Sequence, residues 1–279
     1  MFYSISDKGF RNGSSLLQNL HTMRDAGFTH IHFSHKWTSP EAMAPGEVER
    51  WQAALAATGM KVLDAHGTHP GVCNFWSTDA VVRRRAVDLM IHRLEVTRAL
   101  GGDAVVYHVP EWGECSASMV LGYVDALARL EEIAVGMGVA VALENHYVSE
   151  LNRRVLTACF ERFRPEFVGF TFDTGHGQLA GDSDWLCHNC GDRLRVLHLN
   201  DNDGLKDQHW NPRDPRGTVD WAPVVEMVAR SSYTKPLQLE VRWDPDMHGT
   251  HAAFLTDAFR QTHWLSEQVS QLRRGRAAG

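Results

Sequence analysis

The residues best placed to do chemistry are carboxylates and histidines that follow short apolar runs. In FTFDTGHGQLAG, residues 170–181, the apolar run stops at Asp173, and His176 follows three residues later. Asp173 could cap a following helix, since Asp is a favoured N-cap residue. The two side chains could also hold a metal ion at the mouth of a barrel, with Gly175 and Gly177 letting the chain turn sharply. If so, other apolar runs should end in the same residue types.

Consecutive apolar runs along the chain do end in a carboxylate or an imidazole. These residues are His66, His69, His108, Glu144, Asp173, His176, His198 and Glu240. Burying several acids without counter-charges costs several kcal/mol each, and the nearby arginines are few. A divalent cation would supply the missing positive charge, so the pattern predicts a metal site.

The expected site is rich in oxygen ligands. Glu, Asp and His side chains suit Mn²⁺, Mg²⁺ or Co²⁺ better than a structural zinc site, which favours thiolates. We expect Mn²⁺, with Co²⁺, Mg²⁺ and Zn²⁺ as alternatives. The segment 201–221 adds Asp207 and His209, two residues apart. It is long enough to fold over the mouth of the site, although it could also be a solvated surface loop.

The elements that must position these side chains alternate along the chain. Helical spacing characterises the segments 14–27, 81–101 and 120–138, among others. The apolar runs lie at 2–6, 30–34, 61–67, 104–109, 139–145, 167–173, 195–201 and 237–243. Near-continuous Val/Ile/Leu runs between helices are typical of a parallel sheet buried on both faces.

Eight such strands with their helices predict an α/β fold, a single (β/α)8 TIM barrel. An open doubly wound sheet is less well supported, since no G-x-G-x-x-G follows the first apolar run. We expect residues 1–272 to form the barrel and the basic end, 273–279, to be a disordered tail. Active sites of such barrels lie at the C-terminal ends of the strands, so the candidate side chains should converge there.

Composition limits the classes of function. The net charge is −6, which argues against a nucleic-acid partner. No apolar stretch approaches the ~20 residues of a membrane span, so no membrane association is expected. Five cysteines without framework spacing, and no evident signal peptide, favour a cytoplasmic location. The C-x-x-C at Cys187 and Cys190 lacks a second pair, which favours helix-face thiols over a zinc site.

Four segments carry a family resemblance: LENH, FDTGHGQLAG, VLHLNDND and LEVRW. Together they resemble the xylose isomerase-like barrel superfamily, which joins sugar isomerases and epimerases, inosose dehydratases and apurinic endonucleases. Resemblance to ketose 3-epimerases implies that the metal ligands are Glu144, Asp173, His198 and Glu240. It also implies that His176 and Glu150 contact the substrate. An Arg of the epimerase pattern is replaced here by Gly204, with Lys206 nearby.

The endonuclease branch resembles this chain in a different respect, because its members hold three metals. That resemblance implies further ligands at His66, His108, His176, Asp207 and His209. The loops after the strands are poor in lysine, however, which argues against gripping DNA. A multinuclear-metal phosphoesterase of small substrates therefore stays open as an alternative.

The leading hypothesis is a divalent-metal-dependent isomerase or epimerase of a small sugar or keto-polyol. Glu144 and Glu240 would remove and return a proton on opposite faces of a substrate carbon, through an enediolate that the metal stabilises. The substrate-contacting residues would be His66, His108, Glu150, His176, Lys206 and Trp112. A dehydratase acting on a keto-polyol such as an inosose would use the same enediolate and remains an alternative. A catalytically inactive sugar-binding barrel ranks last, and a homo-oligomer is compatible with the resemblance.

Overall fold

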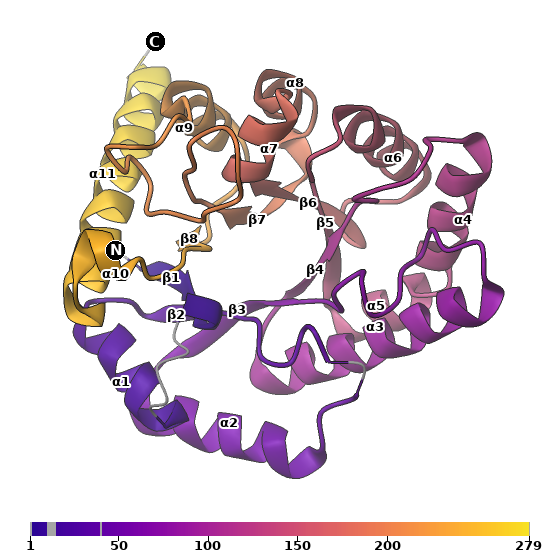
Figure 1. The fold of residues 1–279 in the computed structure, drawn as a ribbon, viewed down its shortest axis with the longest axis horizontal. Coiled ribbons are helices and arrows are strands. Elements are labelled where there is room, and N and C mark those ends of the chain that lie inside the picture. The colour runs from indigo at the N-terminus through magenta and orange to yellow at the C-terminus, as the bar shows by residue number, and fades with distance from the viewer. Residues whose placement is uncertain (1, 10–14, 40, 279) are drawn as a thin grey trace.

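A ring of parallel strands forms the centre of the molecule (Figure 1). The computed structural model describes residues 2–9, 15–39 and 41–278. The strands are β1 Tyr3–Ser6, β2 His30–Phe33, β3 Lys61–His66, β4 Ala104–His108, β5 Ala140–Glu144, β6 Val168–Asp173, β7 Leu194–His198 and β8 Leu237–Leu239. Each coincides with one of the apolar runs of the sequence, with β7 beginning one residue before its run, so the predicted strand pattern is confirmed.

The ring closes almost completely. Neighbouring strands pair in parallel in the order β7-β6-β5-β4-β3-β2-β1-β8. A parallel bridge from Leu199 to Leu239 joins the two ends of the sheet, where Leu199 N donates to Gln238 O at 3.1 Å. The architecture is the predicted single (β/α)8 TIM barrel.

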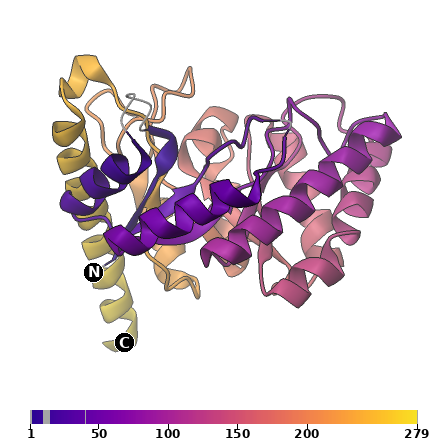
Figure 2. The ribbon, with the colours of Figure 1, turned by 90° about the horizontal axis from the view of Figure 1, so that it is seen from below.

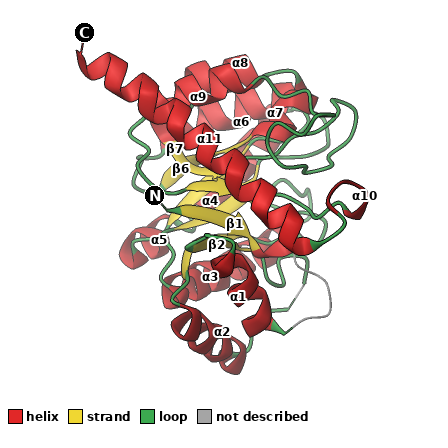
Figure 3. Cartoon of the chain, turned by 90° about the vertical axis from the view of Figure 1, so that its left-hand side faces the viewer, coloured by secondary structure: helices red, strands yellow, loops and turns green. Residues whose placement is uncertain are grey.

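Helices surround the ring on its outer face (Figure 1). They are α1 Leu16–Asp25, α2 Pro45–Thr58, α3 Ala80–Leu100, α4 Ala117–Ala128, α5 Glu131–Met137, α6 Ser149–Arg162, α7 Thr174–Ala180, α8 Ser183–Asn189, α9 Trp221–Arg230, α10 Pro245–His248 and α11 His251–Ala278, with short 3-10 turns η1 Asp7–Gly9 and η2 Gly191–Arg193. The longest, α11, packs against α9 and β8 along one side of the barrel (Figure 3). No described helix combines the length and apolarity that a membrane span requires.

Side-chain alternation along the strands separates two apolar regions. On β4 and β5, Val105 and Val141 belong to the large core between sheet and helices. Val106 and Ala142 belong to a small separate cluster, which fits the opposite, inward face of the strands. His108 lies two residues beyond Val106, and Glu144 two beyond Ala142. The period of two therefore directs both polar side chains into the barrel, above a floor of small apolar residues.

Two helix predictions need correction. The segment 120–138, expected as one helix, forms α4 and α5, because the chain leaves the first helix at Arg129 and restarts after Leu130. Residues 273–278, expected as a disordered tail, are the last turns of α11, which project past the barrel (Figures 2 and 3). Arg273 anchors them, since its guanidinium donates to Val228 O and Tyr233 O at 2.9 and 2.5 Å.

Candidate metal centre

Strand register brings the predicted ligands together at the C-terminal end of the barrel. His108 on β4 is paired directly with Glu144 on β5. Asp173 on β6 is likewise paired with His198 on β7. Because parallel strands of a barrel end on one face, residues far apart in the sequence meet there.

Glu144, Asp173, His198 and Glu240 form the central group, and all four are buried. His198 Nδ1 lies 3.0 Å from Glu144 Oε1, 3.3 Å from Glu240 Oε2 and 3.9 Å from Asp173 Oδ2. One nitrogen thus faces three carboxylates that come from different strands. This is the arrangement expected of ligands around one cation.

The central group concentrates negative charge in a water-excluded site. Burial alone would lower the pKa of His198, but the carboxylates of Glu144 and Glu240 outweigh it and raise the pKa to about 9. Burial would raise the pKa of Glu240, yet Lys8 and His198 hold it well below its usual value. For Asp173, burial and the charge of Glu144 prevail and raise the pKa. Without a cation, protons on the imidazoles therefore balance part of this charge.

Asp173 caps a helix with one oxygen and turns the other towards the central group. Its Oδ1 accepts from His176 N at 2.8 Å and so caps α7, while Oδ2 faces the central group. Gly175 and Gly177 do not form the expected sharp turn, since both have helical backbones. A Cβ at Gly175 would lie 2.0 Å from Asn200 Oδ1. The glycine is needed because helix and loop approach closely.

Two further groups adjoin the central one. His66 and His108 place their Nε2 atoms 3.6 and 3.2 Å from Glu144 Oε2. His209 Nε2 and His176 Nε2 lie 2.8 and 3.8 Å from the two oxygens of Asp207. The donor atoms of each group lie within 4.8 Å of one another. Every ligand candidate of the sequence except His69 is therefore within one of three neighbouring groups of metal-donor atoms, which we call the donor groups.

The long loop after β7 carries Asp207 and His209 to the cavity and is built around a buried carboxylate. Asp201 accepts hydrogen bonds from the backbone N–H groups of Thr218 and Val219 and from Trp221 Nε1, at 3.0 to 3.2 Å. Both ends of the loop are tied to this one side chain. The loop is thus tied to the barrel at both ends, with Leu205 exposed at its tip.

Unsatisfied buried atoms show that these groups fit a divalent cation. Glu144 Oε2 and Asp207 Oδ1 are buried and have no hydrogen-bond donor in the described part of the chain. Buried carboxylate oxygens are normally satisfied, because leaving them unpaired is costly. A cation bound by these oxygens would satisfy them, and the Glu, Asp and His set suits Mn²⁺, Co²⁺ or Zn²⁺.

Some residues of the site were not predicted from the sequence. His108, Glu111 and His146 form a fourth group of donor atoms, and Lys8 Nζ donates to Glu240 Oε1 at 3.3 Å. Two of these residues could have been found from their positions in the sequence. Lys8 follows the first apolar run, and His146 stands two residues after Glu144. Applying the strand-end rule to the first strand, and one step further along the fifth, would have found both.

A polar chain inside the barrel also escaped prediction. His32 Nδ1 lies 2.6 Å from Asp64 Oδ1, which accepts from Gln238 Nε2 at 3.0 Å, and Ser4 Oγ donates to Gln238. All four side chains are buried. The ring of His32 meets the ring of His198 edge-on at 4.5 Å. This row of hydrogen-bonded side chains therefore supports His198 through ring contact.

Three predicted substrate contacts lie apart from the donor groups. Glu150, at the start of α6, has a 68% exposed side chain near Arg154. Lys206 is exposed on the loop after β7. Trp112 is 46% exposed and meets Trp76 edge-on in a groove of about 830 Å³ outside the donor groups. Their contact with substrate stays a prediction.

The cavity at the donor groups is small, about 190 Å³. Its lining comprises Lys8, Trp37, His66, His69, His108, Glu111, His146, Tyr147, His176, Asp207, His209, Glu240 and Arg242. Trp37 offers an aromatic face, with Lys8 Nζ 4.4 Å from its ring centre. Such a volume, walled by polar groups and one indole, suits a small polar molecule.

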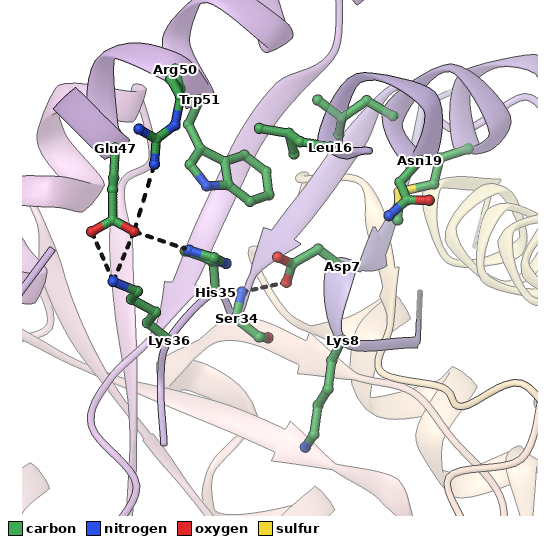
Figure 4. Close-up of a pocket in the computed structure, with 12 residues that line it drawn as sticks. Asp7, Lys8, Leu16, Asn19, Ser34, His35, Lys36, Glu47, Arg50 and Trp51 are labelled. Atoms are coloured by element: carbon green, nitrogen blue, oxygen red, sulfur yellow. Dashed lines mark hydrogen bonds and ion pairs between the residues drawn. The ribbon is translucent and has the colours of Figure 1, made fainter. Parts of the chain in front are cut away.

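A neighbouring cavity of about 350 Å³ lies between α1, α2 and the ends of β1 and β2. Figure 4 shows Glu47 there, surrounded by Lys36, His35 and Arg50. The hydrogen bond from Lys36 lowers the pKa of Glu47 to about 2, so these charges satisfy one another. Lys8 extends away from them (Figure 4) towards Glu240. The donor groups described above therefore remain the stronger candidate site.

The chain is similar to several known proteins in sequence or in fold. A curated protein of Sinorhizobium fredii, the uncharacterized protein y4fM, is 27% identical over 267 residues, covering 85% of this chain and 83% of that protein. A D-tagatose 3-epimerase-like protein matches with a TM-score of 0.76 and 19% identity, covering 99% of both chains. L-ribulose 3-epimerase matches with a TM-score of 0.76 and 19% identity, covering 100% of this chain and 98% of that one.

A third solved structure, the IOLI protein with a binding zinc atom, has a TM-score of 0.76 and 18% identity, covering 97% of this chain and 99% of that one. At such identities these likenesses establish a shared fold. The family model described as xylose isomerase-like TIM barrel matches residues 20–262. Because that match spans most of the sequence, the chain belongs to the xylose isomerase-like TIM barrel family.

Proposed function

We propose that this protein is a divalent-metal-dependent isomerase or epimerase of a small sugar or keto-polyol. The observation that carries the proposal is the placement of two carboxylates around one nitrogen. Glu144 at the end of β5 and Glu240 after β8 lie within 3.3 Å of His198 Nδ1 and approach it from different strands. Two buried carboxylates beside one cation site are what proton transfer on both faces of a carbon requires.

The residues of the site would have separate roles in the reaction. A divalent cation held by Glu144, Asp173, His198 and Glu240 would supply positive charge to the substrate's carbonyl oxygen and make the neighbouring C–H more acidic. The carboxylate on one face accepts the proton from that carbon. The carboxyl group on the other face returns one, so the configuration inverts with no net redox change. His176 lines the cavity and would orient a substrate oxygen.

Shared fold supports the proposal, since proteins named D-tagatose 3-epimerase-like and L-ribulose 3-epimerase have the same barrel. A bound zinc in a third relative supports a cation site. For this chain we propose Mn²⁺, because three of the four central ligands offer oxygen. A dehydratase would use the same residues and differ only in whether a hydroxyl leaves beside the carbonyl.

The test combines metal content with a substrate screen. Protein purified without chelators is measured by elemental mass spectrometry and then assayed on ketoses and inososes, with stereochemistry and water loss followed by NMR. Epimerised or isomerised product with about one Mn per chain supports the proposal. Metal-free protein that turns over substrate normally would refute it.

A multinuclear phosphoesterase is a second candidate, and a specific observation favours it. The groups His66/His108/Glu144 and His176/Asp207/His209 flank the central group, and several neighbouring cations could activate water against a phosphate ester. About three zinc ions per chain, with hydrolysis of small phosphate esters and no ketose conversion, would favour this candidate over the first.

A further inference from the structure

Three cavity histidines share one orientation. In each, Nδ1 faces a main-chain carbonyl and Nε2 faces a carboxylate of the donor groups. The Nδ1 distances are 3.3 Å for His66 to Gly67 O, 3.0 Å for His176 to Asn145 O and 2.7 Å for His209 to Glu240 O. A carbonyl only accepts, so Nδ1 carries a proton and Nε2 is the ring atom left to bind a cation.

His108 has the same orientation but a different partner. Its Nδ1 lies 2.5 Å from Glu111 Oε1, and its Nε2 lies 3.2 Å from Glu144 Oε2. The partner is thus a carboxylate side chain, supplied by the loop that follows β4. Glu111 lines the cavity with a side chain that is 13% exposed.

The short distance excludes the alternative that His108 Nδ1 and Glu111 ligate one cation. Ligand atoms that are each ~2.0–2.2 Å from a tetrahedral ion lie roughly 3.3 Å apart. At 2.5 Å the two atoms instead share a proton, with Nδ1–H donating to the carboxylate. Within the fourth donor group, His146 Nε2 lies 3.6 Å from the same Oε1 and is outside hydrogen-bond distance.

Glu144 presents its two oxygens to different groups. Oε1 lies 3.0 Å from His198 Nδ1 in the central group. Oε2 lies 3.2 and 3.6 Å from the Nε2 atoms of His108 and His66. A carboxylate arranged in this way can serve two neighbouring cation sites at once.

We propose that Glu111 is a positioning residue that completes a second divalent-cation site formed by His66, His108 and Glu144. Its hydrogen bond fixes the ring of His108, so that Nε2 faces His66 and Glu144. A carboxylate partner also makes the imidazole a stronger ligand, and the loss of such partners weakens metal binding 10–100-fold. The inference rests on the proposed metal-dependent function and concerns a residue that contacts no cation itself.

The test is calorimetric titration of Zn²⁺ into the full chain after removal of bound metal by chelation. His66→Ala identifies the binding step that belongs to the second site, because it removes one of that site's three ligands. Glu111→Ala should weaken that same step about 10–100-fold and leave the step of the central group within about twofold. Glu111→Gln should weaken it less, because the amide oxygen still accepts from Nδ1–H. Glu114→Gln, an exposed carboxylate on the same loop, is the matched control.

Each outcome decides the proposal. A selective loss in Glu111→Ala with partial recovery in Glu111→Gln supports it. Three results would overturn it. The second step could be unchanged in Glu111→Ala, all steps could weaken equally together with a lower Tm, or the His66→Ala titration could be identical to that of the wild type. If the wild-type chain binds no Zn²⁺ at the central group, the proposed function fails instead, and the two failures are therefore distinguishable.

Discussion

Glu144 Oε1 and His198 Nδ1 lie 3.0 Å apart, although 54 residues separate them in the sequence. β5 and β7 do not pair with each other, because β6 lies between them. The contact therefore spans the mouth of the barrel above β6. The imidazole therefore lies where either its own proton or a bound cation can balance the charge of the carboxylates. The first prediction follows from the replacement of one by the other.

Metal-free protein should lose stability as the pH rises from about 6.5 to about 9. Glu144 and Glu240 outweigh burial and raise the pKa of folded His198 to about 9, above the unfolded value of ~6.5. The stabilisation is therefore complete below about pH 6.5 and is lost as the pH rises through the folded pKa. Thermal melts of chelated protein between pH 6 and 9.5 measure this loss. With Mn²⁺ bound, Tm should change much less, and a flat profile without metal would contradict the assignment.

Chelation should abolish turnover and lower the Tm. The central group then has carboxylates balanced only by imidazolium and Lys8, and the ligand-linked contribution RT ln(1 + [L]/Kd) is lost. Mn²⁺ or Co²⁺ should restore activity better than Ca²⁺, which prefers six to eight oxygen ligands. Activity that survives exhaustive chelation, verified by elemental mass spectrometry, would overturn the metal-dependent interpretation.

Glu240→Gln should keep the fold and most of the metal affinity but lose turnover. The amide retains a ligand oxygen and the side-chain volume, yet it cannot accept a proton, so kcat should fall on the order of 10²–10⁴-fold. Circular dichroism and Tm serve as the fold check. Glu161→Gln, on the exposed surface of α6, is the control, while Glu150→Gln separately tests the predicted substrate contact. Turnover of Glu240→Gln near wild type would refute the two-carboxylate mechanism.

Asp207→Ala should distinguish the two candidate functions. In an isomerase that works through the central group, the change removes only the neighbouring His176/Asp207/His209 group, and kcat should fall less than about tenfold. In a phosphoesterase that uses all the groups, the loss should approach complete inactivation. Metal content per chain measured on the same sample shows whether a cation was lost with the carboxylate.

Gly175→Ala should damage the site through packing. A Cβ there would meet Asn200 Oδ1 at 2.0 Å, and Asn200 Nδ2 donates to Asp173 Oδ2 at 2.9 Å. We expect a destabilisation of about 1–3 kcal/mol from overpacking, together with weaker metal binding. Gly136→Ala in α5 is the matched control. No atom lies within 4 Å of its added Cβ, so it should stabilise by about 0.5–1 kcal/mol. Equal melting curves for the two variants would contradict the packing argument.

Strand positions and most ligand candidates could be predicted because both depend on short-range pattern. The period of two that buries Val106 and Ala142 also directs His108 and Glu144 inward, so an apolar run ending in a polar residue indicates the cavity. Glu111 follows a strand by three residues, within a loop, where no period applies. Its role depends on the path of the backbone, which is not encoded in local spacing.

Other errors have the same physical origin. Gly175 looked like a turn residue, yet it is required by the approach of Asn200 from a distant segment. The basic C-terminal residues looked like a frayed end, but Arg273 finds carbonyl acceptors near α9. In both cases the deciding contact joins residues that are far apart in the sequence, so the local sequence pattern does not reveal it.

The loop tied to Asp201 has an evolutionary consequence. The Asp201 side chain that ties the loop is hidden from solvent, while Leu205 at the tip is 82% exposed and does not pack against the interior. Mutations can therefore accumulate at positions 205 and 206 in a lineage without disturbing Asp207 or His209, whereas Gly204 is constrained by its left-handed backbone, with φ +75°. Descendants of this barrel could acquire new substrate preferences there first, and randomised libraries aimed at altered selectivity would sample that tip at little risk to the catalytic scaffold.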